Sequence, residues 1–70
     1  MKTIGITCDD YKLSHFEKEF EAADVEFIVH DIPFLSKLIR IYVEEEDYDR
    51  TCSKVDRICR KLELTKPWIN

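Results

Sequence analysis

Hydrophobic and polar residues follow two different periods along this chain, and the change of period divides it into segments. Residues 25–43 hold two apolar segments rich in β-branched and aromatic side chains, joined by a connector that contains Pro33. This pattern predicts a β-hairpin that supplies most of a small sheet. In residues 3–8 apolar and polar side chains alternate, which predicts a further, half-buried strand.

Two other segments repeat their apolar residues at spacings of three and four, the period of an amphipathic helix. The first segment, residues 14–23, combines Phe16 and Phe20 with charged residues on the opposite side. The second segment, residues 48–63, has the stronger signal, and its apolar stripe consists of Tyr48, Cys52, Val55, Cys59 and Leu62. We therefore expect each helix to bury one stripe against the sheet.

The predicted elements follow in the order βαββα, which indicates a single small α+β domain over residues 1–70. Because a strand-helix-strand unit is right-handed and each helix has one apolar stripe, we expect both helices on one face of a three-stranded mixed sheet. The simplest arrangement places residues 37–43 in the middle of that sheet. This split βαβ arrangement resembles a truncated ferredoxin-like or ACT-like module in its element order alone. No motif of those families is present, so the resemblance implies no ligand. Residues 64–69 could add a short edge strand, although Pro67 is unfavourable there.

The predicted sheet has a second face that no element covers, and this face is less polar than a solvated one. Ile28, Leu38 and Tyr42 lie there in the expected register, and we expect Phe34 and Trp68 near its rim. A domain of this size buries only about 60% of its unfolded surface, so exposed apolar area favours an interface. We therefore expect these five residues to mediate homodimerisation or contact with another protein.

Composition and charge narrow the classes of function. Hydrophobic residues make up 44% and charged residues 37% of the chain, which is typical of a folded domain. The net charge of -4 argues against a general nucleic-acid or anionic-membrane binder, since both need a positive field. No apolar run approaches the ~18 residues that span a bilayer, and residues 1–8 are too short for a signal peptide. We expect a cytoplasmic protein.

Catalytic motifs are missing from the sequence, which favours a non-enzymatic protein. The single glycine, Gly5, excludes a phosphate-binding loop or a dinucleotide fingerprint. Cys8 would need a lowered pKa to act as a nucleophile, but the carboxylates of Asp9 and Asp10 raise it. The three cysteines form no C-x-x-C pair, and their odd number fits reduced thiols.

Residues with ligand chemistry gather at one predicted edge of the sheet. There the ends of the first two strands bring Cys8 and Asp10 towards His30 and Asp31. Thiolate, imidazole and carboxylate groups bind zinc and similar metals, so a ligand- or metal-binding regulatory domain is the second hypothesis. Against it, the spacing matches no known ligand pattern, and capping and burial explain these residues equally well. We expect no cofactor.

A basic stripe on the second predicted helix supports a third hypothesis. Its members, spaced by four, three and four residues, are Arg50, Lys54, Arg57 and Lys61. Such a stripe could meet phosphates or an acidic partner, and the chain would then be a partner-binding monomer. The alternative is a solvated face that balances nearby acids, which the acidic net charge favours. The sequence leaves the partner and the biological process open.

Overall fold

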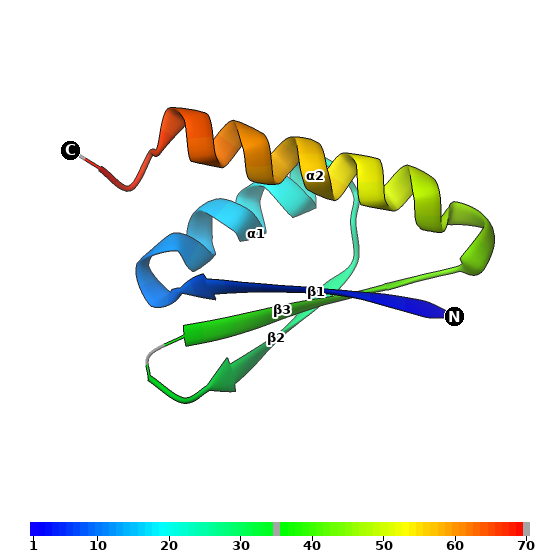
Figure 1. Ribbon diagram of the computed structural model, residues 1–70, viewed down its shortest axis with the longest axis horizontal. Helices are drawn as coiled ribbons and strands as arrows, with labels where there is room; N and C mark the ends of the chain where they lie inside the picture. Colours follow the sequence, from blue (N-terminus) through cyan, green and yellow to red (C-terminus); the bar gives the residue numbers. More distant parts are fainter. Residues whose placement is uncertain (35, 70) are drawn as a thin grey trace.

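The computed structural model describes residues 1–34 and 36–69, and these residues form three strands and two helices (Figure 1). The strands are β1 (Lys2–Asp9), β2 (Phe27–Ile32) and β3 (Ser36–Val43). The helices are α1 (Leu13–Ala22) and α2 (Tyr48–Thr65), each preceded by a short 3-10 turn, η1 (Asp10–Lys12) and η2 (Glu45–Asp47). The α+β class and the βαββα order predicted from the sequence are confirmed.

The sheet has the strand order β1-β3-β2, so the last strand of the sequence lies in the middle. β3 pairs antiparallel with both neighbours, and Ile6 and Val29 both lie opposite Ile39. The expected central position of residues 37–43 is therefore confirmed, but the expected mixed sheet is wrong. β1 and β2 run in the same direction, yet β3 separates them, so the two do not pair in parallel.

Figure 1 shows α1 and α2 together over one face of the sheet, with no described element over the other face. The hydrophobic core fills the layer between helices and sheet. Phe20, Ile39 and Ile41 are fully buried there, and the Phe20 ring lies 5.7 Å from the Phe27 ring of β2, centroid to centroid. Because side chains alternate along a strand, Ile39, Ile41 and Val43 of β3 are buried on the helix side, and the even-numbered residues face away.

The buried stripe of α2 differs from the expected one. Its buried residues are Val55, Ile58 and Leu62, whereas Cys52 and Cys59 are only half-buried. An isoleucine side chain has more apolar surface than a cysteine side chain, so burying Ile58 in the core stabilises the fold more than burying a cysteine would. The two cysteines are left at the margin of the helix.

The chain after α2 forms a turn instead of a strand. Lys66 adopts a left-handed conformation with φ 43°, and its N–H donates a hydrogen bond of 2.8 Å to the carbonyl oxygen of Leu62. Leu64 and Thr65 extend the last turn of α2, and residues 66–69 carry no strand. Of the two alternatives left open by the sequence, three strands or three strands and a short edge strand over residues 64–69, the described residues form the first, because the helix continues through Thr65 and Pro67 lacks a ladder donor.

Candidate interaction surfaces

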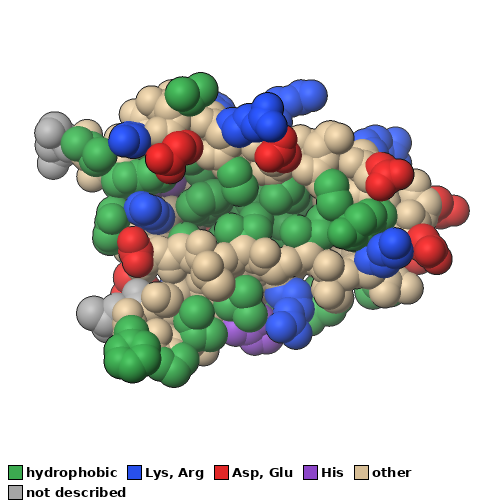
Figure 2. Space-filling view, viewed as in Figure 1, with side chains coloured by type: hydrophobic (Ala, Val, Ile, Leu, Met, Phe, Trp, Pro, Cys, Tyr) green, Lys and Arg blue, Asp and Glu red, His purple; other side chains and the backbone are tan. Residues whose placement is uncertain are grey.

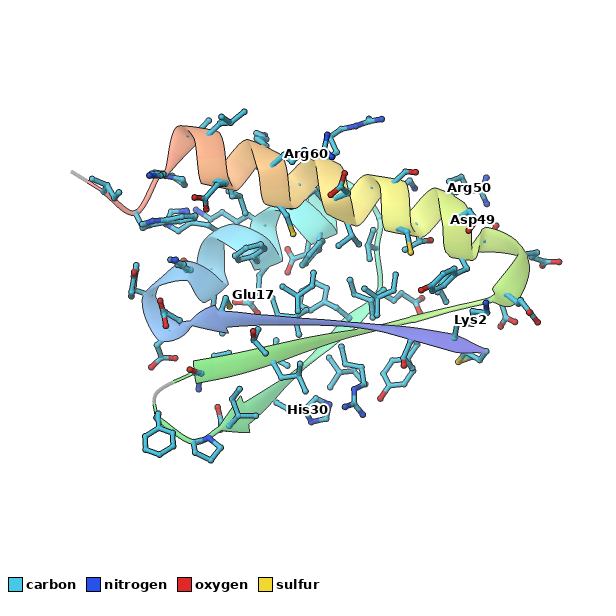
Figure 3. The ribbon with its side chains drawn as sticks, viewed as in Figure 1. Lys2, Glu17, His30, Asp49, Arg50 and Arg60 are labelled. Carbon is cyan, nitrogen blue, oxygen red and sulfur yellow. The ribbon has the colours of Figure 1, made fainter. Side chains whose placement is uncertain are left out.

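The uncovered face of the sheet, here called the open face, consists of alternate residues of all three strands. They are Thr3, Gly5 and Thr7 of β1, Ile28 and His30 of β2, and Leu38, Arg40 and Tyr42 of β3. Ile28 is 51% and Tyr42 37% exposed. Figure 3 shows His30 on the side of the sheet that faces away from the helices. The open face thus combines exposed apolar and aromatic side chains with two basic ones.

Gly5 lies in the central rung of the open face, where it is opposite Arg40. A Cβ added at Gly5 would lie 3.6 Å from a methyl group of Leu38, which is ordinary van der Waals contact. Because glycine has no side chain, the surface of the open face has a shallow depression at its middle. Leu38 is half-buried beside it.

Four of the five predicted interface residues lie on or next to the open face. Ile28, Leu38 and Tyr42 share it, as expected. Phe34 lies in the turn between β2 and β3, with a left-handed φ of 68° and a side chain that is 96% exposed. A phenylalanine exposed to this degree extends the apolar surface beyond the end of the hairpin.

Trp68 is placed on the opposite side of the molecule, so its expected position near the rim of the open face is wrong. Its side chain is half-buried against the core on the helix side. Its ring lies 5.9 Å from the His15 ring, and Lys12 Nζ lies 4.9 Å from its centroid. The left-handed Lys66 turns the chain back at the end of α2, which keeps the tail on this side.

Arg40 is a residue that reasoning from the sequence did not include in the interface. It is exposed, and among residues 1–34 and 36–69 its guanidinium takes part in no ion pair. It lies between Gly5 and Ile28 in the central rung of the open face. Alternation along β3 assigns Arg40 to this face, but its central position follows only from the register with β1.

The polar edge considered for a metal ion contains a lysine instead. Lys37 Nζ lies 3.5 Å from a carboxylate oxygen of Asp10 and forms an ion pair with Asp31. The ammonium group therefore occupies the position between the two carboxylates and supplies the positive charge there. No cluster of three or more metal-ligating side chains exists within the described part of the chain.

The two remaining candidate ligands, Cys8 and His30, lie on opposite faces of the sheet. Burial raises the pKa of the Cys8 thiol, and the charge of Asp9 adds to the effect. Such a thiol stays protonated at neutral pH and is a poor ligand and a poor nucleophile. The expected grouping of Cys8, Asp10, His30 and Asp31 is thus wrong, since Lys37 bridges two members and the sheet separates the others.

The basic stripe on α2 is partly neutralised by neighbouring acids. Arg50 pairs with Asp47, and Lys61 Nζ lies 2.9 Å from the carboxylate of Glu19 on α1. Lys54 is half-buried, and Arg57 is exposed. These contacts agree better with a solvated face that balances acids than with a surface reserved for phosphate.

Comparison of the chain with protein-family models, curated proteins and solved structures found no match in any of the three. Neither helix in the described ranges is both long and apolar enough to pass through a bilayer. Among the described surfaces, the open face is the sheet face that no described element covers.

Proposed function

We propose that this chain is a small non-enzymatic interaction module that forms a homodimer through the open face of its sheet. The observation that carries the proposal is the exposure of Ile28 and Tyr42 on a sheet face that no described element covers. Surface of this kind on a small domain marks an interaction site. The free cysteines Cys8, Cys52 and Cys59 fit a reducing, cytoplasmic setting.

We also propose that the fold is a split βαβ of the ferredoxin-like type. The strand order β1-β3-β2, with both helices over one face, agrees with three of the strands of that arrangement. In such a fold the helices cover one face of the sheet. The other face remains accessible for contact between copies.

The dimensions of the open face suit a weak dimer. β1 and β3 each have 8 residues, which at ~3.3 Å per residue and ~4.8 Å between strands gives a face of about 26 by 14 Å. Two such faces bury about 730 Å² in total, less than the ~1,000 Å² of a stable specific interface, which is the size of a weak or transient contact. We therefore expect association that depends on concentration in the accessible range.

Charge on the open face restricts how two copies can meet. A two-fold axis through Arg40 would bring two guanidinium groups together without an acid between them, which is unfavourable. Arg40 and Tyr42 lie at equal distances on either side of Ile41 along β3. A two-fold axis between the two sheets that passes near Ile41 therefore places Arg40 of each copy over Tyr42 of the second copy. An arginine over a tyrosine ring is attracted by the ring quadrupole, and the symmetry gives this contact twice.

The test is the solution mass over a concentration series, measured by light scattering for the wild type and two variants. Tyr42→Glu places a charge on the open face, and Leu64→Glu makes the same kind of change at an 85% exposed position on α2. The wild type and Leu64→Glu should rise from monomer to dimer together, while Tyr42→Glu stays monomeric. A wild type that remains monomeric, or two variants that behave alike, would contradict the proposal.

A further inference from the structure

β1 is an edge strand whose outer side has no partner among residues 1–34 and 36–69. All 8 of its residues pair with β3 in one uninterrupted register, so the strand contains no bulge. Residues 3–8 include no proline and no charged side chain, which are features that protect an edge from further pairing. The backbone N–H and C=O groups on the outer side of β1 are therefore free to form another ladder.

A second copy of the chain can add to this edge only in certain registers. When two copies of one strand pair antiparallel about a two-fold axis normal to the sheet, side chains directly opposite each other lie on the same face. The residue on the axis then lies opposite its own counterpart, and its neighbours on the two sides exchange partners. The register is therefore defined by the residue that lies on the axis.

With Ile6 on the axis, β1 is complementary to itself. On the helix side of the sheet Ile6 lies opposite Ile6 of the second copy, and Ile4 lies opposite Cys8. These three side chains are half-buried, so apolar groups meet apolar groups on that side. On the open side Thr3 lies opposite Asp9, whose carboxylate can accept a hydrogen bond from the threonine hydroxyl.

Opposite charges meet at both ends of this register. Lys2 lies opposite Asp10 of the second copy, and the symmetry gives this contact twice. Within the described ranges Lys2 takes part in no ion pair, and its Nζ lies 4.6 Å from the centroid of the Tyr48 ring. Asp10 Oδ1 lies 3.5 Å from Lys37 Nζ, yet the Asp10 side chain is still 55% exposed and can accept a second cation.

The other edge of the sheet, β2, lacks this complementarity. β2 has 6 residues, and its helix side carries Phe27, Val29 and Asp31. With Val29 on a two-fold axis, Phe27 would lie opposite Asp31. With His30 on the axis, Val29 would lie opposite Asp31. Both registers place a carboxylate against an apolar side chain, which is unfavourable.

Pairing at β1 would also cover apolar surface next to the strand. Figure 2 shows a band of apolar side chains between α2 and β1. At one end of the band Cys8 and Cys59 line one cavity of about 350 Å³, and Ile4 of the second copy would lie beside Cys8. Charged side chains of both signs border the band in Figure 2, so no field of a single sign opposes a second copy.

We infer that two copies of this chain join through β1, antiparallel and with Ile6 on the two-fold axis, and form one six-stranded sheet with all four helices on one side. The contact is separate from the open face. Backbone hydrogen bonds, each with a small net gain in water, hold most of it. We therefore expect it at protein concentrations above those that complete the open-face dimer, where the mass of the wild type rises beyond that of a dimer.

Amide hydrogen exchange, followed by NMR at two protein concentrations, tests the contact directly. The protein is Tyr42→Glu, in which the open face is blocked. Between micromolar and millimolar protein, the β1 amides that point away from β3 should exchange at least about tenfold more slowly. The outward amides of β2 are the internal control and should not change. Unchanged exchange in β1, or slower exchange at β2 instead, overturns the inference.

A charge exchange tests the register. In the Tyr42→Glu protein, Lys2→Glu and Asp10→Lys should each raise the dissociation constant of the edge dimer about fivefold, measured by sedimentation equilibrium. The two substitutions together should restore it to within about twofold, because opposite charges meet again. Lys18→Glu with Glu21→Lys, at exposed positions on α1, is the matched control and should have no effect. Single variants without effect, or a double variant without recovery, overturn the inference.

The edge contact and the open-face contact fail in different experiments. A wild type that dimerises while its β1 amides still exchange rapidly at millimolar concentration keeps the open-face dimer and overturns the edge contact. If the β1 amides become protected while the wild type and Tyr42→Glu have equal masses, the edge contact is supported and the open-face dimer is the proposal that fails.

Discussion

The covered face and the open face of the sheet are made by alternate residues of the same strands, but they differ in the kinds of side chain that they hold. On β3 the covered side holds Ile39, Ile41 and Val43, which are at most 9% exposed. The open side holds Leu38, Arg40 and Tyr42, a leucine, a cation and an aromatic residue. The covered side of β3 therefore holds aliphatic side chains at these three positions, while its open side mixes apolar and charged ones. Mixed surfaces of this kind are typical of recognition, and uniform ones of stability.

The largest effect expected from this comparison is on folding. Ile39→Ala removes a fully buried side chain from the covered face and should lower the free energy of unfolding by about 3 kcal/mol. Ile28→Ala, on the 51% exposed position of the open face, should cost less than about 1 kcal/mol. Urea titration of both variants at low protein concentration makes the measurement. Equal losses would mean that the two faces are equally buried in solution.

A smaller effect is expected on association. Arg40→Ala removes the two symmetric contacts between guanidinium and tyrosine ring, each worth about 0.5–1 kcal/mol, so the dimer dissociation constant should rise about tenfold. Arg57→Ala, an exposed arginine on α2, is the control and should leave the constant unchanged. Sedimentation equilibrium distinguishes the two. A stronger dimer for Arg40→Ala would show that the two arginines repel each other across the axis.

The smallest effect concerns Lys37, at the end of the covered face. The hydrogen bond from Lys37, together with its charge, holds the pKa of Asp31 below its ordinary value of 3.8. The pair therefore stabilises the fold above that pH, and the contribution is lost as the pH falls through the lowered pKa of Asp31. Lys37→Met should lower the urea midpoint slightly at pH 6, and the difference from the wild type should shrink as the pH falls through the lowered pKa of Asp31. A difference between the proteins that persists in acid would exclude this ion pair as its cause.

Much of this fold could be predicted from the sequence, because the decisive signals are local. Alternation placed Ile39 and Ile41 on the buried side of β3, and helical spacing placed Phe16 and Phe20 in the core. The central position of β3 followed from taking the simplest arrangement, a split βαβ unit in which the return strand lies between the other two. Each of these steps needs only the chain around the residue and one general rule of packing.

The errors arose where position depends on contacts between distant segments. Lys37 lies between Asp10 and Asp31 only because of the register of three strands, so a list of candidate ligands could not reveal it. The rotation of α2 depends on the competition between Ile58 and the cysteines for a core of fixed width. Trp68 follows a left-handed lysine, a conformation that glycine usually signals and that no glycine marks here.

The two pairings of β3 also differ in how far the chain must travel to make them. β2 and β3 follow each other in the chain, and Ile32 pairs with Ser36. β1 is separated from β3 by α1 and β2, yet its Asp9 lies opposite the same Ser36. Hairpins close within about 1–10 μs, and pairings between distant segments form more slowly. We therefore expect β1 to dock last during folding. Until it does, one side of β3 is open, and a strand from another nascent chain can take the place of β1 and give a domain-swapped product.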